Sequence, residues 1–202
     1  MNGDPATAAP ATRAADIPRQ RQGGRTGTTV LAVVGTDVHP FDRLLAWLTD
    51  WHRTRPAAPT MIVQYGHSTP PALPGGVPFL DHAGLQRAMA TATLVVSHGG
   101  PATITEARRH GRTPIVVPRD PAHGEHVDDH QQRFGRRLAA AGLVRLCEDS
   151  AALAAALDLG LADPTAFAVA AEAEPAVPPG VARVGEIVDA LIARRMSRRR
   201  RR

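Results

Sequence analysis

Residues 93 to 118 read TLVVSHGGPATITEARRHGRTPIVVP, and this stretch decides the fold. An apolar, β-branched run ends in Ser97-His98-Gly99-Gly100, a helical segment opens at Pro101, and a second apolar run follows at 115–117. The order is strand, glycine turn, helix, strand. Glycines let the backbone approach a ligand closely, and the helix N-terminus behind them presents unpaired N–H groups and a partial positive charge. The stretch therefore predicts a site for a phosphate or diphosphate of a nucleotide-like anion.

The alternation of strand and helix continues on both sides of this stretch. Apolar and β-branched runs predict strands at 28–34, 60–65, 77–80, 94–96, 115–117 and 143–147. Helical spacing or a proline start predicts helices at 41–52, 82–92, from 101 onward and 126–141. This alternation is typical of an α/β fold with a doubly wound, Rossmann-like parallel sheet.

Length and composition fit one α/β domain with tails. The chain has 202 residues, of which 43% are hydrophobic, enough for a substantial core. No apolar run approaches the ~20 residues of a membrane-spanning helix, and the N-terminus lacks the apolar region of a secretory signal. We predict a disordered arm at 1–27, a Rossmann-like domain at 28–160, an Ala/Pro-rich connector at 161–180 and a C-terminal helix with an Arg-rich tail at 181–202.

The net charge of +5 is concentrated near the C-terminal end, where Arg194, Arg195 and residues 198–202 follow an amphipathic stretch. Proteins that bind nucleic acid more often spread basic residues over a folded face, so we expect no nucleic acid as a partner. Two interpretations of the tail stay open. It contacts anionic lipid, at about 1 kcal/mol per residue near the surface, or it is a solvated tail that aids solubility. The single cysteine, Cys147, allows no internal disulfide and fits a reducing cytoplasm.

Three polar clusters follow predicted strands, at residues 35–39, 98–101 and 118–131. They are distant in the sequence, but the carboxyl ends of parallel strands meet at one edge of the sheet, and ligands of open α/β sheets bind there. We therefore expect the three clusters to converge on one site.

Five motifs in combination resemble the glycosyltransferase family 28 C-terminal domain. They are GTDVHPFDRL (35–44), IVQYGHS (62–68), VVSHGGPATITEA (95–107), PIVVPR (114–119) and EHVDDHQ (125–131). The resemblance covers about residues 28 to 147. It is greatest to the small split-subunit members that make lipid-linked sugars for exopolysaccharides or N-glycan precursors.

The resemblance implies a fold, an activity and partners. The fold would be the donor-binding C-terminal half of a GT-B fold. The activity would be that of a hexosyltransferase that moves a sugar from a UDP-sugar, with inversion, to a polyprenyl diphosphate-linked acceptor. A separate membrane-anchored glycosyltransferase subunit would bind that acceptor, and the chain would be cytoplasmic, peripheral to the inner face of the plasma membrane. The UDP-sugar is a substrate, and neither a cofactor nor a metal is expected.

The resemblance also assigns the donor site. Its predicted residues are Gly35, Thr36, Gln64, Gly66, Ser68, His98, Gly99, Gly100, Thr103, Glu106, His126, Asp129 and Gln131. Backbone N–H groups of Gly99 and Gly100 would bind the diphosphate. His98 would add a donor that gains charge beside the anion, and Thr103 a hydroxyl. The alternative for the two glycines is a tight turn without a ligand.

Glu106 has two competing interpretations. In the family, a glutamate at this position accepts hydrogen bonds from both ribose hydroxyls, which a carboxylate can do with its two oxygens. Alternatively, Thr103 to Glu106 matches a capping box, with the glutamate at position N3. Pro101 prefers the first helical position, which places the cap at Gly100 and favours the ligand role.

The remaining donor residues are assigned in three groups. Asp129 and Gln131 would bind sugar hydroxyls, with His126 beside the diphosphate. Gly35 and Thr36 would lie near the phosphates or the acceptor. The residues that would shape the uracil pocket, or else form an ordinary loop, are Gln64, Gly66 and Ser68.

Asp37 and His39 form a candidate catalytic pair. Transfer with inversion needs a base that takes the proton of the acceptor hydroxyl as it attacks the anomeric carbon, and the leaving diphosphate needs its growing charge stabilised. His39 is the candidate base. In the larger relatives the base usually comes from the acceptor half, and this alternative stays open.

Three other functions also stay open. His126 and His130, spaced i, i+4 with carboxylates nearby, would suit a zinc hydrolase, but the HExxH order is absent and no third ligand is evident. A sugar-nucleotide epimerase-like enzyme is a second alternative. A non-catalytic subunit that binds nucleotide or recruits a partner to the membrane is the third.

Overall fold

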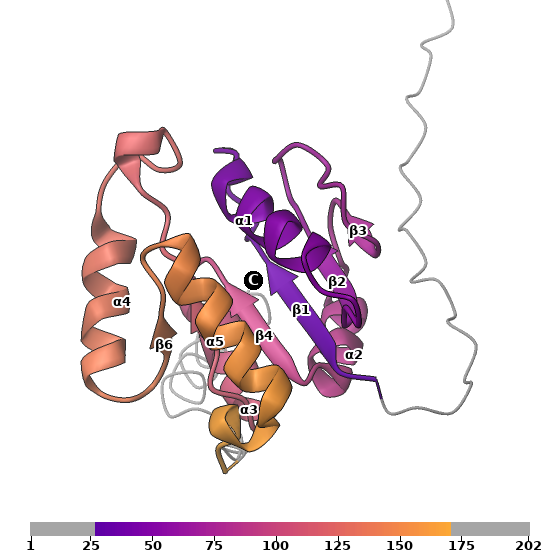
Figure 1. The fold of residues 1–202 in the computed structure, drawn as a ribbon. Coiled ribbons are helices and arrows are strands. Elements are labelled where there is room, and N and C mark those ends of the chain that lie inside the picture. The colour runs from indigo at the N-terminus through magenta and orange to yellow at the C-terminus, as the bar shows by residue number, and fades with distance from the viewer. Residues whose placement is uncertain (1–26, 171–202) are drawn as a thin grey trace, which may run out of the picture. The chain divides into compact units, whose positions relative to one another are not determined.

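The structure, a computed structural model, describes residues 27–170. Its core is a six-stranded parallel sheet with the order β3-β2-β1-β4-β5-β6 (Figure 1). The strands are β1 (Thr29–Val33), β2 (Thr60–Gln64), β3 (Gly76–Val77), β4 (Leu94–Ser97), β5 (Ile115–Val116) and β6 (Arg145–Leu146). The first strand, β1, lies in the middle of the sheet, and the later strands extend it in both directions, which confirms the predicted doubly wound fold.

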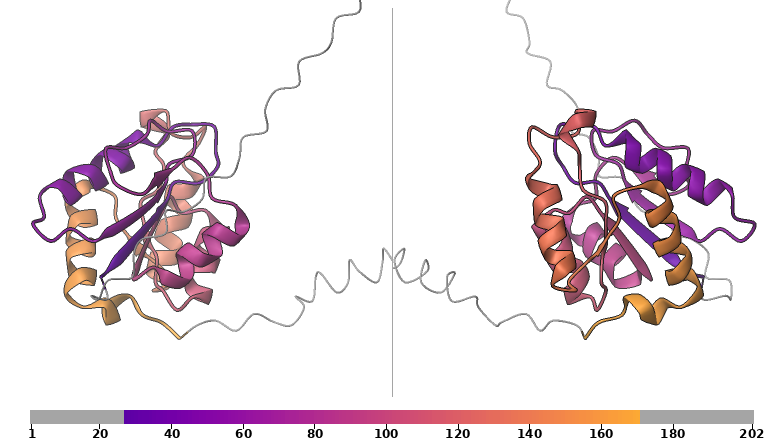
Figure 2. Two further views of the ribbon diagram at one scale, coloured as in Figure 1. Left: turned by 90° about the vertical axis from the view of Figure 1, so that its right-hand side faces the viewer. Right: turned by 60° about the vertical axis from the view of Figure 1, so that its left-hand side comes forward.

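Helices cover both faces of this sheet. They are α1 (Asp42–Arg53), α2 (His82–Thr91), α3 (Pro101–Arg109), α4 (His130–Ala140) and α5 (Ser150–Ala162), with short 3-10 turns η1 (Pro121–His123) and η2 (Pro164–Phe167). Buried side chains of α1 and α5 share one core cluster, and those of α2 pack in a second cluster. Figure 2 shows α1 and α5 on one side of the sheet and α2 on the other.

Successive side chains of β1 point to opposite faces of the sheet, and both faces are covered, which explains why the strand is apolar. Val30 and Ala32 belong to the cluster with α1 and α5, while Leu31 and Val33 belong to the cluster with α2. All four side chains are buried. Strands covered on both faces are continuous apolar runs, as parallel sheets require.

The predicted helix at 126–141 begins four residues later, at His130. The Asp128 carboxylate accepts a hydrogen bond from the His130 amide at 3.1 Å, and such a local turn competes with helix formation. Residues 126–129 therefore form a loop at the edge of the sheet. The predicted strand at 77–80 is shorter in the structure and begins one residue earlier, at Gly76–Val77.

Residues 161–168 are folded onto the domain, where the sequence predicted the start of a connector. Helix α5 extends to Ala162, and η2 follows it. Phe167 is buried, and Arg112 pairs with Ala168 in a β-bridge. The signal for α5 was Asp149, whose carboxylate accepts from the Ala152 amide at 2.7 Å as an N-cap.

The other predictions on the tails fall outside the described residues. These are the arm up to residue 26, the rest of the connector from 171, the C-terminal helix and the Arg-rich tail. Within residues 27–170, no helix has the length and apolar character needed to cross a membrane.

Candidate functional site

The three predicted polar clusters converge at the carboxyl edge of the sheet. They follow β1, β4 and β5, which are adjacent strands. His98 Nδ1 lies 3.3 Å from the Val33 carbonyl oxygen, and His126 Nε2 lies 3.7 Å from an Asp37 carboxylate oxygen. These contacts join segments 65 to 89 residues apart in the sequence, so the predicted convergence is confirmed.

Arg119, three residues after the end of β5, ties the loop after β1 to the loop after β5. Its side chain is 1% exposed, and its Nη2 donates to the Val34 carbonyl at 2.9 Å. Its Nη1 donates to the carbonyls of His39 at 2.6 Å and Glu125 at 3.0 Å, and the guanidinium carbon lies 4.9 Å from the centre of the Phe41 ring. Burial lowers the pKa of Arg119, and the charges of Asp37 and Glu125 oppose this. We did not single out this residue from the sequence.

A buried ion pair holds α1 against the loop after β5. Arg43 donates through Nε and Nη2 to the two carboxylate oxygens of Glu125, at 2.9 and 2.7 Å. Its Nη2 also donates to the Pro118 carbonyl at 3.0 Å. Glu125 in turn accepts from the amide of Asp120 at 2.9 Å. Bidentate Arg–carboxylate pairs fix orientation, so this contact positions the loop that carries His126.

The glycine turn after β4 closes around the His98 ring. Gly35 and Gly99 have φ values of +91° and +93°, a region that favours glycine. A Cβ at Gly35 would lie 2.8 Å from His98 Cε1, and one at Gly100 would lie 2.5 Å from His98 Nε2. Glycine at both positions is therefore required for packing against the imidazole, whether or not a ligand also approaches the turn.

Helix α3 begins at Pro101 with Gly100 as its N-cap, as predicted. No side chain of the described residues caps it. The Gly99 amide donates to the Ser97 hydroxyl at 3.1 Å, so this N–H group is already engaged. Pro101 has no N–H group, so the donors at this helix start are the amides of Gly100, Ala102 and Thr103.

His98 is held in its neutral form. Burial lowers the pKa of His98 to about 4, although the hydrogen bond to the Val33 carbonyl acts in the opposite direction. A carbonyl only accepts, so Nδ1 carries the proton and Nε2 carries a lone pair. Donation to a diphosphate through Nε2 would therefore require His98 to take up a proton together with the anion.

Glu106 lies beyond the cap of α3, which excludes the capping-box interpretation. Its Oε2 accepts from Gln86 Nε2 on α2 at 2.8 Å, and its Oε1 accepts from Arg109 Nη1 at 2.9 Å. The hydrogen bond from Gln86, together with Arg109, lowers the pKa of Glu106 and keeps it ionised. Each oxygen retains a lone pair, so the carboxylate can accept two further hydroxyls.

Asp37 and His39 form a dyad on the loop after β1. Asp37 Oδ1 accepts from the His39 amide at 2.8 Å and contacts His39 Nδ1 at 2.6 Å. The hydrogen bond from the His39 amide is the main cause that lowers the pKa of Asp37. An ionised carboxylate on Nδ1 fixes the tautomer and leaves Nε2 free to accept a proton. This is the geometry expected of a general base.

The predicted sugar-binding residues lie where α4 begins. Asp129 is the N-terminal flanking residue of α4 and pairs with Arg133 at 2.9 Å. Gln131 is buried, and its Oε1 accepts from the Arg119 amide at 3.3 Å. The rings of His126 and His130 lie 4.6 Å apart although only His130 is helical. Sugar binding by Asp129 and Gln131 stays a prediction.

Gln64 and Ser68 use their polar groups to hold loops. Gln64 Nε2 lies 3.4 Å from the Gly35 carbonyl, and its Oε1 accepts from the Leu80 amide at 3.1 Å. The Ser68 hydroxyl accepts from the Phe41 amide at 2.8 Å. Both side chains are buried, and Gly66 beside them has a positive φ of 59°. These contacts match the ordinary-loop alternative, and the uracil role stays a prediction.

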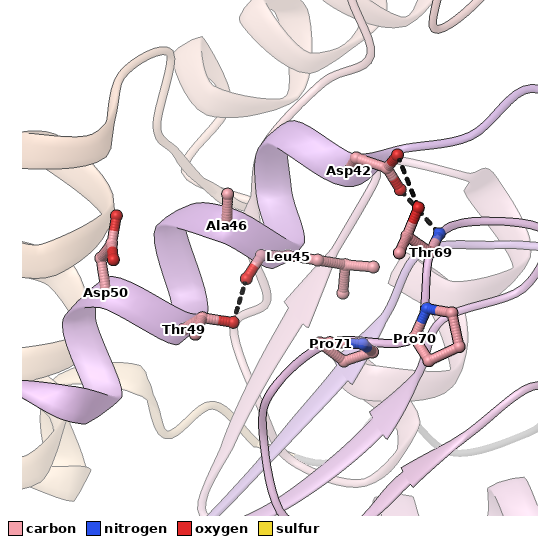
Figure 3. A pocket seen from close by; sticks show the side chains of 8 residues that line it. All are labelled: Asp42, Leu45, Ala46, Thr49, Asp50, Thr69, Pro70 and Pro71. Carbon is pink, nitrogen blue, oxygen red and sulfur yellow. Dashed lines mark hydrogen bonds between the residues drawn. The ribbon is translucent and has the colours of Figure 1, made fainter.

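A pocket of about 250 Å³ has none of the predicted site residues in its walls (Figure 3). It is formed by α1 and the loop after β2, with Asp42, Leu45, Ala46, Thr49, Asp50, Thr69, Pro70 and Pro71 in its walls. The Asp42 carboxylate accepts from the Thr69 amide at 2.8 Å. The walls carry two carboxylates and no basic side chain, which disfavours an anionic ligand.

Comparison with known families identifies the domain. The model of the glycosyltransferase family 28 C-terminal domain matches residues 64–182, which is more than half of the chain. The chain belongs to this family. A comparison with curated proteins finds no match.

Solved glycosyltransferase structures share the fold. MurG from Acinetobacter baumannii aligns with a TM-score of 0.53 and 20% identity, over 73% of this chain and 44% of its own. The glycosyltransferase of kitacinnamycin gives 0.55 and 17%, over 77% and 40%. The calicheamicin glycosyltransferase CalG4 gives 0.52 and 15%, over 76% and 38%. The chain thus spans less than half the length of these proteins, and its fold is that of the C-terminal half of a GT-B fold.

The family match also separates two parts of the site. It begins at Gln64, so the glycine turn, Glu106 and the loop before α4 lie within it. Gly35, Thr36 and the Asp37–His39 dyad lie before it, although the sequence resemblance extended to residue 28. The places of Gly35 and of the Asp37–His39 dyad in the site rest on the contacts described above, and Thr36 lies between them in the loop after β1.

Proposed function

We propose that this chain is the donor-binding, catalytic subunit of an inverting hexosyltransferase that uses a UDP-sugar. The observation that carries the proposal is the uncapped N-terminus of α3 with the ionised Glu106 in the same helix. A diphosphate suits the helix N-terminus, and ribose hydroxyls suit the carboxylate.

The donor would be bound by groups that have spare hydrogen-bonding capacity. Amides of Ala102 and Thr103 would donate to diphosphate oxygens, with the helix dipole adding favourable potential. Gln86 and Arg109 hold the Glu106 carboxylate in place before the ribose arrives. This preorganisation reduces the entropy lost on binding.

The reaction itself would use the Asp37–His39 dyad. The acceptor oxygen attacks the anomeric carbon while the bond from that carbon to the UDP oxygen breaks, and UDP leaves with the electron pair. His39 Nε2 takes the acceptor proton, and Asp37 stabilises the resulting imidazolium. The amides of α3 stabilise the charge that grows on the diphosphate.

The acceptor would be a polyprenyl diphosphate-linked sugar bound by a separate, membrane-anchored subunit. The family resemblance to split-subunit members supports this, as do two exposed apolar side chains beside the dyad. Val38 is 72% exposed and Val127 is 76% exposed, on the two loops that meet at Asp37 and His126. A partner that covers these loops would exclude water from the reaction. The chain would then work at the cytoplasmic face of the membrane.

Calorimetry with UDP tests the donor site. We expect wild-type protein to bind UDP, and Glu106→Gln to weaken binding by about tenfold or more, because hydrogen bonds to a charged acceptor contribute about 1.5–3 kcal/mol. Glu148→Gln is the matched control, since that exposed carboxylate pairs with Arg136 across the surface. Equal UDP affinity of wild type and Glu106→Gln would refute the assignment.

A transfer assay separates catalysis from binding alone. With labelled UDP-sugars and the partner subunit, His39→Gln should lower the rate by about 10²–10⁴-fold and leave UDP affinity unchanged. Full activity of His39→Gln would show that His39 is not the base and that the partner subunit supplies it. Binding of UDP without any transfer by wild type would instead identify a non-catalytic nucleotide-binding subunit.

A further inference from the structure

The loop before α4 brings three metal-ligating side chains together. His126, Asp128 and His130 each offer one atom, and these atoms lie within 4.8 Å of one another. His126 Nδ1 lies 3.5 Å from Asp128 Oδ1, and His130 Nδ1 contacts the same oxygen. The sequence suggested two of these ligands and no third. The structure supplies Asp128 as the third because the helix starts later than predicted.

His126 Nδ1 faces two polar atoms of Asp128. It lies 3.4 Å from the Asp128 amide nitrogen and 3.5 Å from the Asp128 carboxylate oxygen. That oxygen also accepts a hydrogen bond from the His130 amide at 3.1 Å and contacts His130 Nδ1. The loop therefore gathers two imidazoles around one carboxylate oxygen, and each of the three side chains can offer a lone pair to a metal ion.

A neighbouring carboxylate supports the orientation of this ligand. Asp37 Oδ2 lies 3.7 Å from His126 Nε2, the nitrogen on the opposite side of the ring. Metal-binding histidines commonly donate their other N–H group to a carboxylate, which fixes the tautomer and raises the basicity of the ligand nitrogen. The His126 side chain is 13% exposed, so its position is restricted.

We propose that His126, Asp128 and His130 bind a divalent transition-metal ion, such as Zn²⁺. Two imidazole nitrogens and one carboxylate oxygen form a ligand set that suits Zn²⁺ and other first-row ions better than Ca²⁺ or Mg²⁺. Three protein ligands leave coordination positions open to water or to an anionic oxygen, unlike a closed structural site. The site shares His126 with the predicted donor residues, but Zn²⁺ binding by these three side chains does not require UDP.

Zinc titration of the purified full-length chain tests the site, with calorimetry for affinity and stoichiometry. We expect one Zn²⁺ per chain at this site. Substitution with Co²⁺ should produce visible absorption bands with the intensity of a four- or five-coordinate ion. Asp128→Asn and His130→Ala should each weaken Zn²⁺ binding by about tenfold or more, because each removes a ligand. Both side chains are exposed, so circular dichroism should show an unchanged fold.

Matched controls lie within a few residues of the ligands. Asp129→Asn removes the adjacent carboxylate, which pairs with Arg133, and His123→Ala removes an exposed imidazole outside the cluster. Both controls should retain wild-type Zn²⁺ affinity. The proposal is overturned if wild type binds no Zn²⁺, or if Asp128→Asn and Asp129→Asn bind it equally well.

Discussion

The ion pair between Arg43 and Glu125 is the structural link between α1 and the loop that carries His126. Arg43→Met keeps the apolar stem of this side chain and removes the guanidinium. Among residues 27–170, the Glu125 carboxylate, which is 4% exposed, then retains the amide of Asp120 as its one donor. The Pro118 carbonyl also loses its hydrogen bond from Nη2. We expect this variant to be strongly destabilised.

The expected loss follows from the burial of the pair. Removing one partner of a buried ion pair costs about 3–5 kcal/mol, since an uncompensated charge stays in the interior. The Arg43 side chain is 17% exposed, so water can reach part of the site. We therefore expect the free energy of unfolding to fall by about 3 kcal/mol. For a domain of this size, that corresponds to a decrease in Tm of roughly 10 °C.

Urea unfolding at pH 7, followed by tryptophan fluorescence and circular dichroism, measures this loss. The double variant Arg43→Met/Glu125→Gln should be more stable than Arg43→Met, because a neutral amide replaces the buried charge. Arg53→Met is the control, since its pair with Asp50 is exposed and should contribute little. The reasoning is refuted if Arg43→Met unfolds at the wild-type urea concentration, or if the double variant is no more stable than the single one.

Three further predictions concern packing and protonation. Gly160→Ala should lower the free energy of unfolding in urea by about 1–3 kcal/mol, because its Cβ would lie 2.5 Å from Leu94 Cδ2. We expect this loss despite the higher helix propensity of alanine. A variant as stable as wild type would show that α5 shifts freely. The pKa of His98 is lowered to about 4, so the unfolded chain binds the extra proton and stability should fall as the pH decreases from about 6.5 to about 4. His98→Gln should flatten this pH profile, and an equal slope in both proteins would contradict the assignment. Burial raises the pKa of the Cys147 thiol to about 11, so a thiol reagent such as DTNB should react with it only after unfolding; rapid labelling of the native chain would argue against its burial.

The positions of the central strands could be predicted from the sequence because they depend on local residue composition. Strands buried on both faces must be apolar along their whole length, so β1, β2 and β4 stand out from the sequence alone. The start of α3 was also predictable, because Pro101 fits the first helical position and Gly100 precedes it. Helix α5 was missed, although Asp149 was a recognisable cap.

Local sequence therefore determined the alternation of strands and helices, the glycine turn, the start of α3 and the family to which the domain belongs. Tertiary structure alone decided which side chains meet. Arg119 became the buried link between the loops after β1 and β5, because this contact depends on how two separate loops fold back at one sheet edge. Asp128 became a third neighbour of His126 and His130 because the residues before α4 form a loop. Burial sets the protonation of His98, and no local pattern encodes it, since desolvation is a property of the assembled core.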